Sequence, residues 1–139
     1  MTNKIIMGEV PGAGPAQMDL AELLATRLLV QGNSGSGKSH LLRRLLEQSA
    51  RLVQQAIIDP EGDFVSLAEK FGHLVIEGAD YSEMALHAAG ERMRMHRASD
   101  VLNLEGLDAD QQMKWAAAFL GGMFEAPREY WYPVLVVVD

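Results

Sequence analysis

The sequence predicts an α/β fold in which helices cover both faces of a mainly parallel β-sheet. Short apolar runs alternate with stretches of helical periodicity along all 139 residues, and the connections between them are short. This strand–helix–strand order is typical of βαβ units. Apolar residues make up 48% of the chain, which suffices for a hydrophobic core in one domain of this length.

Compact apolar runs predict the strands of the sheet. A parallel sheet is covered on both faces, so its strands read as continuous apolar runs rather than as an alternating pattern. The run Val134–Val138 is the most strand-like because it is unbroken and rich in valine. A loop rich in proline and glycine at residues 11–15 has space for a further short strand on each side. The strands of the sheet are predicted at residues 27–31, 55–59, 73–77, 100–104 and 134–138.

Helical periodicity predicts the helices between these strands. Asp63 is placed to cap a short helix that Gly72 ends, and Asp108 with Gln111 has the spacing of a capping box. Gly121 and Gly122 each weaken the last helix by about 1 kcal/mol relative to alanine. Close packing against a neighbour is one reason to keep glycine there. The helices are predicted at residues 38–50, 64–71, 82–97 and 108–124.

Composition excludes several classes of protein. A net charge of −7 argues against a general nucleic-acid-binding surface, although it allows a local basic groove. The absence of cysteine excludes a disulfide framework and a thiolate zinc site. The longest apolar stretch, residues 115–124, contains two glycines and is shorter than the ~20 residues of a membrane span. Without a signal-peptide pattern at the N-terminus, we expect a cytoplasmic protein with no membrane association.

The sharpest motif is the run Gly32–Ser39, which matches the P-loop pattern G-x-x-x-x-G-K-[ST]. Glycines allow the backbone to approach a polyphosphate, and amide groups at a helix N-terminus favour an anion. Lys38 would add a charge for the β and γ phosphates, and the Ser39 hydroxyl is placed for Mg²⁺. The alternative is a glycine-rich turn that binds nothing. The predicted nucleotide contacts are Gly32, Asn33, Ser34, Gly35, Ser36, Gly37, Lys38, Ser39 and His40.

The second motif is the last predicted strand, which ends in Asp139. An apolar strand followed by an acid is the Walker B pattern. The carboxyl end of such a strand lies near the bound ligand in open α/β sheets. A carboxylate there supports Mg²⁺. Many parallel strands end in aspartate, so this motif takes most of its weight from the P-loop. Together the motifs predict Lys38 and Asp139 as catalytic residues, and Ser39 and Asp139 as the metal-side residues.

Four segments carry a family resemblance. Leu28–Ser39 looks like the P-loop of HerA-type and FtsK-type ATPases, and Ile57–Asp63 resembles their second-strand motif, which ends D-P-x-G-[DE]. Val101–Leu107 resembles the strand and turn before the next helix of that group, and Val134–Asp139 resembles its Walker B strand. The motif at Asp59-Pro60-Glu61-Gly62-Asp63 is the most specific part. Within the group, HerA-like ATPases with a helicase domain of the DUF87 type look closest.

This resemblance implies a three-layer P-loop NTPase fold of the RecA-like, ASCE type. Residues 1–25 would form an N-terminal extension, and residues 26–139 the N-terminal portion of the ATPase domain. The implied cofactors are ATP and Mg²⁺. The implied activity is that of an ATPase that forms a homo-oligomeric, hexameric ring, translocates on DNA like a helicase, and works with a partner nuclease.

The sequence departs from the family at its end. In this group a glutamate follows the Walker B aspartate, and a sensor residue and a trans-acting arginine come later, whereas this sequence stops at Asp139. We therefore expect a truncated domain that binds nucleotide but hydrolyses it poorly. We also expect one unpaired flank on the strand at residues 134–138 or on the one at 27–31.

Several alternatives remain open at this stage. The chain could be a P-loop kinase, or a nucleotide sensor or scaffold without turnover. Asp59 and Glu61 could position Mg²⁺ or water, or could serve only the turn after their strand. The basic cluster at Glu91–Arg97 could contact DNA phosphates; the interpretation we favour is a solvated helix face with Met93 packed inward.

Overall fold

The computed structural model describes residues 4–33 and 37–139. It divides the chain into two compact units, Met1–Val53 and Gln54–Asp139. The predicted boundary between residues 25 and 26 stays a prediction.

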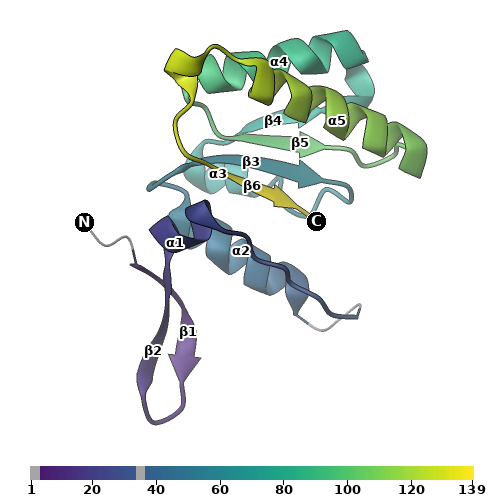
Figure 1. The fold of residues 1–139 in the computed structure, drawn as a ribbon. Helices are drawn as coiled ribbons and strands as arrows, with labels where there is room; N and C mark the ends of the chain where they lie inside the picture. The colour runs from purple at the N-terminus through teal and green to yellow at the C-terminus, as the bar shows by residue number, and fades with distance from the viewer. Residues whose placement is uncertain (1–3, 34–36) are drawn as a thin grey trace. The chain divides into compact units, whose positions relative to one another are not determined.

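The first unit contains a β-hairpin and two helices. Strands β1 (Lys4–Val10) and β2 (Gly14–Asp19) pair antiparallel, as the loop at residues 11–15 predicted (Figure 1). Helix α1 (Leu20–Ala25) follows, and the side chain of Asp19 accepts hydrogen bonds from its first backbone N–H groups. Helix α2 (Lys38–Ser49) is tied to the hairpin because Arg44 Nε donates to the carbonyl of Ile6 at 2.8 Å.

The strand predicted at residues 27–31 is not formed. Residues 27–33 have no regular secondary structure, and Leu28 and Leu29 are 45% and 77% exposed. A strand requires a neighbour for its backbone N–H and C=O groups. No strand in the described part of the chain pairs with this segment, so its apolar run alone does not make a strand.

The second unit is built on a parallel sheet of four strands in the order β4-β5-β3-β6. This arrangement confirms the α/β fold class and four of the predicted strands. Every residue of β3 is buried, which explains its uninterrupted apolar pattern from Ala56 to Ile58. The strands are β3 (Gln54–Asp59), β4 (Leu74–Glu77), β5 (Asp100–Asn103) and β6 (Val134–Val138).

Strand β6 lies at the edge of this sheet. It pairs with β3 on one side, and no described strand pairs with its other side. Val136 and Val138 are 38% and 64% exposed. The expected unpaired flank of residues 134–138 is therefore present.

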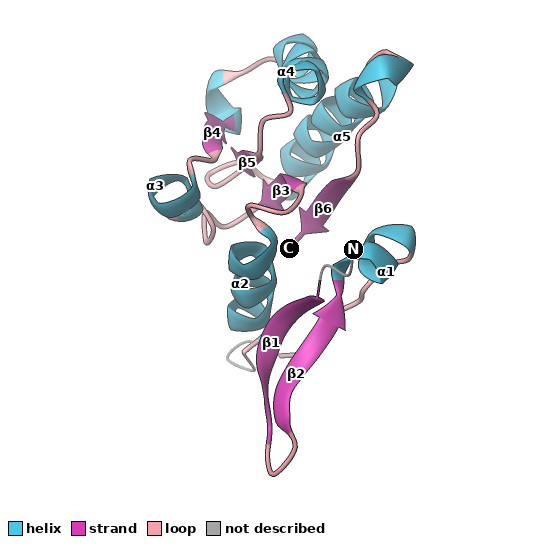
Figure 2. Ribbon diagram, turned by 90° about the vertical axis from the view of Figure 1, so that its left-hand side faces the viewer, coloured by secondary structure: helices cyan, strands magenta, loops and turns pink. Residues whose placement is uncertain are grey.

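Helices cover both faces of the sheet. Helix α3 (Leu67–Phe71) lies on one face, and α4 (Glu83–His96) and α5 (Ala109–Glu125) lie on the other (Figure 2). Short 3₁₀ turns occupy Gly78–Asp80 and Arg128–Tyr130. None of the described helices is long and apolar enough to cross a membrane. The core between the sheet and the α4–α5 pair contains Ala56, Ile58, Ile76, Leu86, Ala89, Met93, Leu102, Leu104, Phe119 and Met123.

The predicted helix ends are mostly correct. Asp108 and Gln111 form the capping box of α5, and Gly72 ends α3 with a left-handed φ of 77°. The prediction that Asp63 caps α3 is wrong. The helix begins at Leu67, after Ser66, and Asp63 lies before it in the turn whose backbone N–H groups bond to the Asp59 carboxylate.

Helices α4 and α5 approach each other closely at two glycines. A Cβ added to Gly90 would collide with the Phe119 carbonyl oxygen, and one added to Gly122 would collide with the His87 carbonyl oxygen. Gly121 differs, because its added Cβ would meet only His87 Cδ2 at an ordinary 3.7 Å. Close packing therefore explains Gly122 but not Gly121.

Candidate functional site

The last three residues of the P-loop motif, Gly37 to Ser39, lie at the start of α2. Gly37 precedes the helix with φ 92°, a left-handed conformation that side chains disfavour. No side chain caps this helix start, and its first turn has no acidic residue. The first N–H groups of a helix have no partner within the helix and favour an anion. This helix end therefore fits a phosphate group.

Only some of the predicted nucleotide contacts lie at the start of α2. Gly32 and Asn33 are exposed in irregular backbone, Lys38 is half-buried, and Ser39 and His40 are exposed on the first turn of α2. The predicted contacts at Ser34, Gly35 and Ser36 lie outside the described residues. The described residues thus place one cation and one hydroxyl at an uncapped helix start.

In the second unit, the Asp59–Asp63 segment forms a tight turn at the carboxyl end of β3. The carboxylate of Asp59 is fully buried and accepts hydrogen bonds from the backbone N–H groups of Asp63 and Phe64, both at 2.9 Å. Burial raises the pKa of Asp59, and these two hydrogen bonds act in the opposite direction. The structure therefore gives Asp59 the turn-forming role. Glu61 is exposed on this turn.

Glycine is required within this turn. Gly62 has φ 76°, and a Cβ there would touch the carboxylate of Glu105 and lie 3.4 Å from Asn103 Oδ1. The turn after β3 thus passes close to the end of β5. Because L side chains rarely adopt this φ, whereas the Glu105 side chain could move, the backbone conformation is the physical reason for glycine in the motif Asp59-Pro60-Glu61-Gly62-Asp63.

The ends of the neighbouring strands are linked by side-chain amides. Asn103 Nδ2 donates to Glu77 Oε2 at 3.0 Å, and Asn103 Oδ1 accepts from the backbone N–H of Glu105 at 3.0 Å. Gln112 Nε2, on α5, donates to the carbonyls of Pro60 and Leu104. Sequence reasoning assigned no role to Asn103 or Gln112. A polar residue that ends a buried strand was the one available signal for Asn103.

Asp139 follows β6 at the same edge of the sheet as Asp59. Its backbone N–H donates to the carbonyl of Ile58 at 3.3 Å, and the residue is half-buried. The described residues contain no group of three or more His, Asp or Glu side chains that could hold a metal by themselves. A Mg²⁺ ion bound through phosphates, waters, one hydroxyl and one carboxylate requires no such cluster.

The family model described as "Helicase HerA, central domain" matches residues 5–116. This range contains the hairpin, the P-loop motif, the Asp59–Asp63 turn and the start of α5, and it ends before Asp139. No curated protein and no solved structure matches the chain. Because the matched range covers more than half of the 139 residues, this chain belongs to the family of the HerA helicase central domain.

Proposed function

We propose that this chain binds ATP with Mg²⁺ and serves as the nucleotide-binding domain of a DNA-translocating motor. The observation that carries the proposal is the P-loop pattern Gly32–Ser39 in a chain of the HerA family. The pattern ends at the start of α2, which has no side-chain cap and follows Gly37 in a left-handed conformation. Helix starts of this kind bind phosphate through backbone N–H groups and the helix dipole.

Each proposed site residue has a distinct task. The loop backbone from Gly32 to Gly37 would surround the phosphates, and the Lys38 ammonium would neutralise charge on the β and γ phosphates. The Ser39 hydroxyl and the Asp139 carboxylate would support the metal, the latter through a water. Mg²⁺, when bound, supplies charge stabilisation for the phosphates during transfer. His40 follows Ser39 on the exposed surface of α2 and would lie beside the nucleotide.

Calorimetric titration of the chain with Mg²⁺–ADP tests the binding site. Lys38→Ala should weaken binding at least tenfold, because it removes the positive charge that faces the phosphates. Lys114→Ala is the matched control, since it removes an exposed lysine from α5, outside the proposed site. Equal affinity for ADP in the Lys38 and Lys114 variants would contradict the assigned role of Lys38.

A second titration separates the metal role from the phosphate role. Asp139→Asn should reduce ADP affinity when Mg²⁺ is present and leave it nearly unchanged when EDTA removes the metal. Lys38→Ala should weaken binding under both conditions. If Asp139→Asn has the same effect with and without metal, Asp139 is not a metal-side residue.

The motor part of the proposal rests on the family alone. A HerA-type motor would form a hexameric ring, bind DNA and work with a nuclease. Phosphate release measured with and without double-stranded DNA distinguishes a DNA-stimulated motor from a nucleotide sensor, which would bind ATP without turnover. Transfer of the γ-phosphate to an added nucleoside monophosphate would instead support a P-loop kinase, but no observation here favours that alternative.

A further inference from the structure

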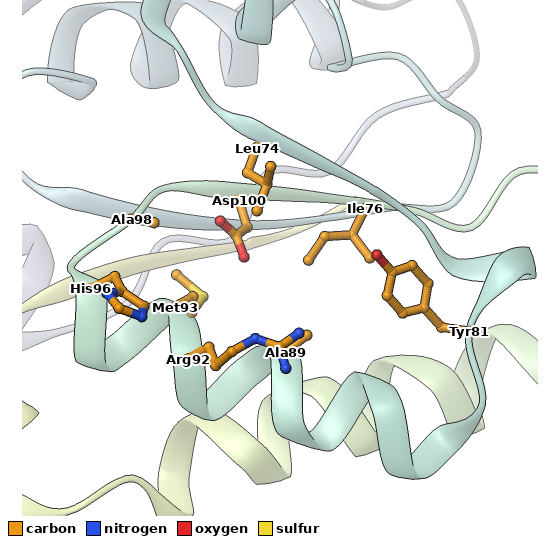
Figure 3. Close-up of a pocket in the computed structure, with 9 residues that line it drawn as sticks. All are labelled: Leu74, Ile76, Tyr81, Ala89, Arg92, Met93, His96, Ala98 and Asp100. Carbon is orange, nitrogen blue, oxygen red and sulfur yellow. The ribbon is translucent and has the colours of Figure 1, made fainter.

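A cavity of about 400 Å³ lies in the second unit, between strands β4 and β5 and helix α4 (Figure 3). We call it the α4 cavity. It lies at the opposite end of the sheet from Asp59 and Asp139, because Asp100 is the first residue of β5, whereas Asp59 is the last residue of β3 and Asp139 follows the last residue of β6. Its chief lining residues are Leu74, Ile76, Arg92, Met93, His96 and Asp100.

The walls of the α4 cavity are mainly apolar. Leu74 and Ile76 project from β4, and Met93 faces them from α4 (Figure 3). Ile76 and Met93 are buried, whereas Leu74 is 58% exposed. The cavity therefore leads from the surface beside β4 into the layer between sheet and helix. An apolar chamber of this size with a few polar groups is typical of sites for small organic ligands.

One polar group inside the cavity lacks a partner. The Asp100 side chain points from β5 towards α4, and the residue is only 1% exposed (Figure 3). Its Oδ1 atom is buried without a hydrogen bond. Burial raises the pKa of Asp100 to about 7. A buried carboxylate oxygen without a donor costs free energy, so a ligand that brings a donor would be bound favourably.

A positive charge stands on the opposite wall. Arg92 lines the cavity from α4 together with His96 (Figure 3). The charge of Arg92 lowers the pKa of Asp100 in opposition to burial, yet these two described residues form no ion pair. A simple cation would meet Asp100 favourably but would be repelled by Arg92. A simple anion would have the reverse problem, so a ligand that carries both charges fits best.

We propose that the α4 cavity binds a free apolar α-amino acid. Its ammonium group would donate to Asp100, and its carboxylate would accept from Arg92 and His96. Its side chain would pack against Leu74, Ile76 and Met93. The α-ammonium and α-carboxylate are attached to the same carbon, so one small ligand can present a donor to Asp100 on β5 and an acceptor to Arg92 on α4 within the same cavity.

Binding of L-phenylalanine to the 139-residue chain, followed by ¹H–¹⁵N NMR, tests this proposal. We expect saturable shifts at the backbone amides of β4, the start of β5 and α4. N-acetyl-L-phenylalanine has no ammonium, and phenethylamine has no carboxylate, so each should bind at least tenfold more weakly. L-phenylalaninamide imitates the first residue of a peptide, and equally tight binding of this probe would overturn the free amino acid as ligand.

Variants give the second half of the test. Asp100→Asn and Arg92→Gln should each reduce the affinity for L-phenylalanine at least tenfold. Arg128→Gln is the control, because Arg128 lies over Trp131, outside the cavity. Absence of saturable shifts in the wild-type chain, or unchanged affinity in a folded Asp100→Asn variant, would overturn the proposal. If Asp100→Asn fails to fold, the comparison of L-phenylalanine with its two analogues on the wild-type chain decides the question.

Discussion

Replacing Gly122 by alanine should separate α4 from α5. The added Cβ would lie 2.8 Å from the carbonyl carbon of His87 and would collide with its oxygen. Both atoms belong to the backbone of α4, so no side-chain rotation can relieve the contact. An ordinary carbon–carbon distance of about 3.6 Å requires the helices to move apart by at least about 0.8 Å, and the closer contact with the oxygen requires more.

A separation of this size weakens the packing between the two helices. A gap of about 0.5–1 Å forfeits a quarter to a half of each dispersion contact. Leu86, Ala89, Met93, Phe119 and Met123 are all buried in the core at this interface. We therefore expect Gly122→Ala to lower the free energy of unfolding by about 3 kcal/mol, the upper end for overpacking. This loss remains after a gain of up to about 1 kcal/mol in helix propensity.

Urea unfolding followed by circular dichroism measures this loss, and Gly121→Ala is the matched control. Gly121 is on the same helix, but its added Cβ meets only His87 Cδ2 at 3.7 Å. Its substitution should leave stability unchanged or raise it by up to about 1 kcal/mol. Gly90→Ala should behave like Gly122→Ala, and the double variant should lose less than the sum because one separation relieves both contacts. Equal effects of the Gly121 and Gly122 substitutions would refute the packing argument.

Other contacts in the second unit give three further predictions. The pKa of Asp100 is about 7 in the folded chain against 3.8 as its ordinary value, so the folded state keeps a proton that the unfolded chain releases between about pH 4 and pH 7. The stability of wild type relative to Asp100→Asn should therefore fall as the pH rises through this window and stay constant above it, whereas a pH-independent difference would contradict the raised pKa. Arg94→Leu should lower the free energy of unfolding, measured with urea, by about 2 kcal/mol, because Arg94 Nη2 donates to the Tyr132 carbonyl at 2.8 Å. Arg97→Leu removes only a cation–π contact with the Tyr132 ring, so it should lower the same free energy by about 1 kcal/mol or less. Val136→Lys should reduce self-association in sedimentation experiments because it places a charge on the unpaired flank of β6, and unchanged association would show that this flank is not involved.

The sheet of the second unit could be predicted because its strands are buried on both faces. A strand that is buried on both faces has a continuous run of apolar residues, as in Ala56–Ile58. The capping box of Asp108 and Gln111 could be predicted for a similar reason, since both partners lie within four residues of each other. In both cases the residues that make up the sequence pattern lie in the same short segment.

Two of the incorrect predictions concern interactions between distant residues, whereas the cap predicted at Asp63 is a local error. Residues 27–31 have the apolar pattern of a strand, but no described strand pairs with them. Arg94 lies in the charged segment Glu91–Arg97, which we interpreted as a solvated helix face. The residue is only 6% exposed, and it donates a hydrogen bond to the carbonyl of Tyr132, 38 positions away. Met93 does pack inward as predicted. The sequence around Arg94 therefore did not indicate that a carbonyl far along the chain would accept its hydrogen bond and allow its burial.

The acids at the carboxyl edge of the sheet divide into two kinds, and this division bears on the proposed chemistry. Asp59 is fully buried and uses both oxygens to hold the turn after β3, so a metal ion or a water could reach it only if that turn opened. Glu77 is likewise engaged with Asn103. Asp139, which follows the strand next to that of Asp59, is half-buried, and Glu61 is exposed.

A carboxylate that supports Mg²⁺ must be fixed by the fold yet accessible to a ligand. Asp139 meets both conditions, because its backbone N–H donates to the Ile58 carbonyl and the residue is only half-buried. Glu61 meets only the second, since it is exposed on a turn. Asp139 is therefore the better candidate for the metal, and Glu61 is the acid to replace next if an Asp139→Asn variant still releases phosphate from ATP. Loss of that residual release in the Asp139→Asn, Glu61→Gln double variant would assign it to Glu61, and persistence would exclude both acids as its source.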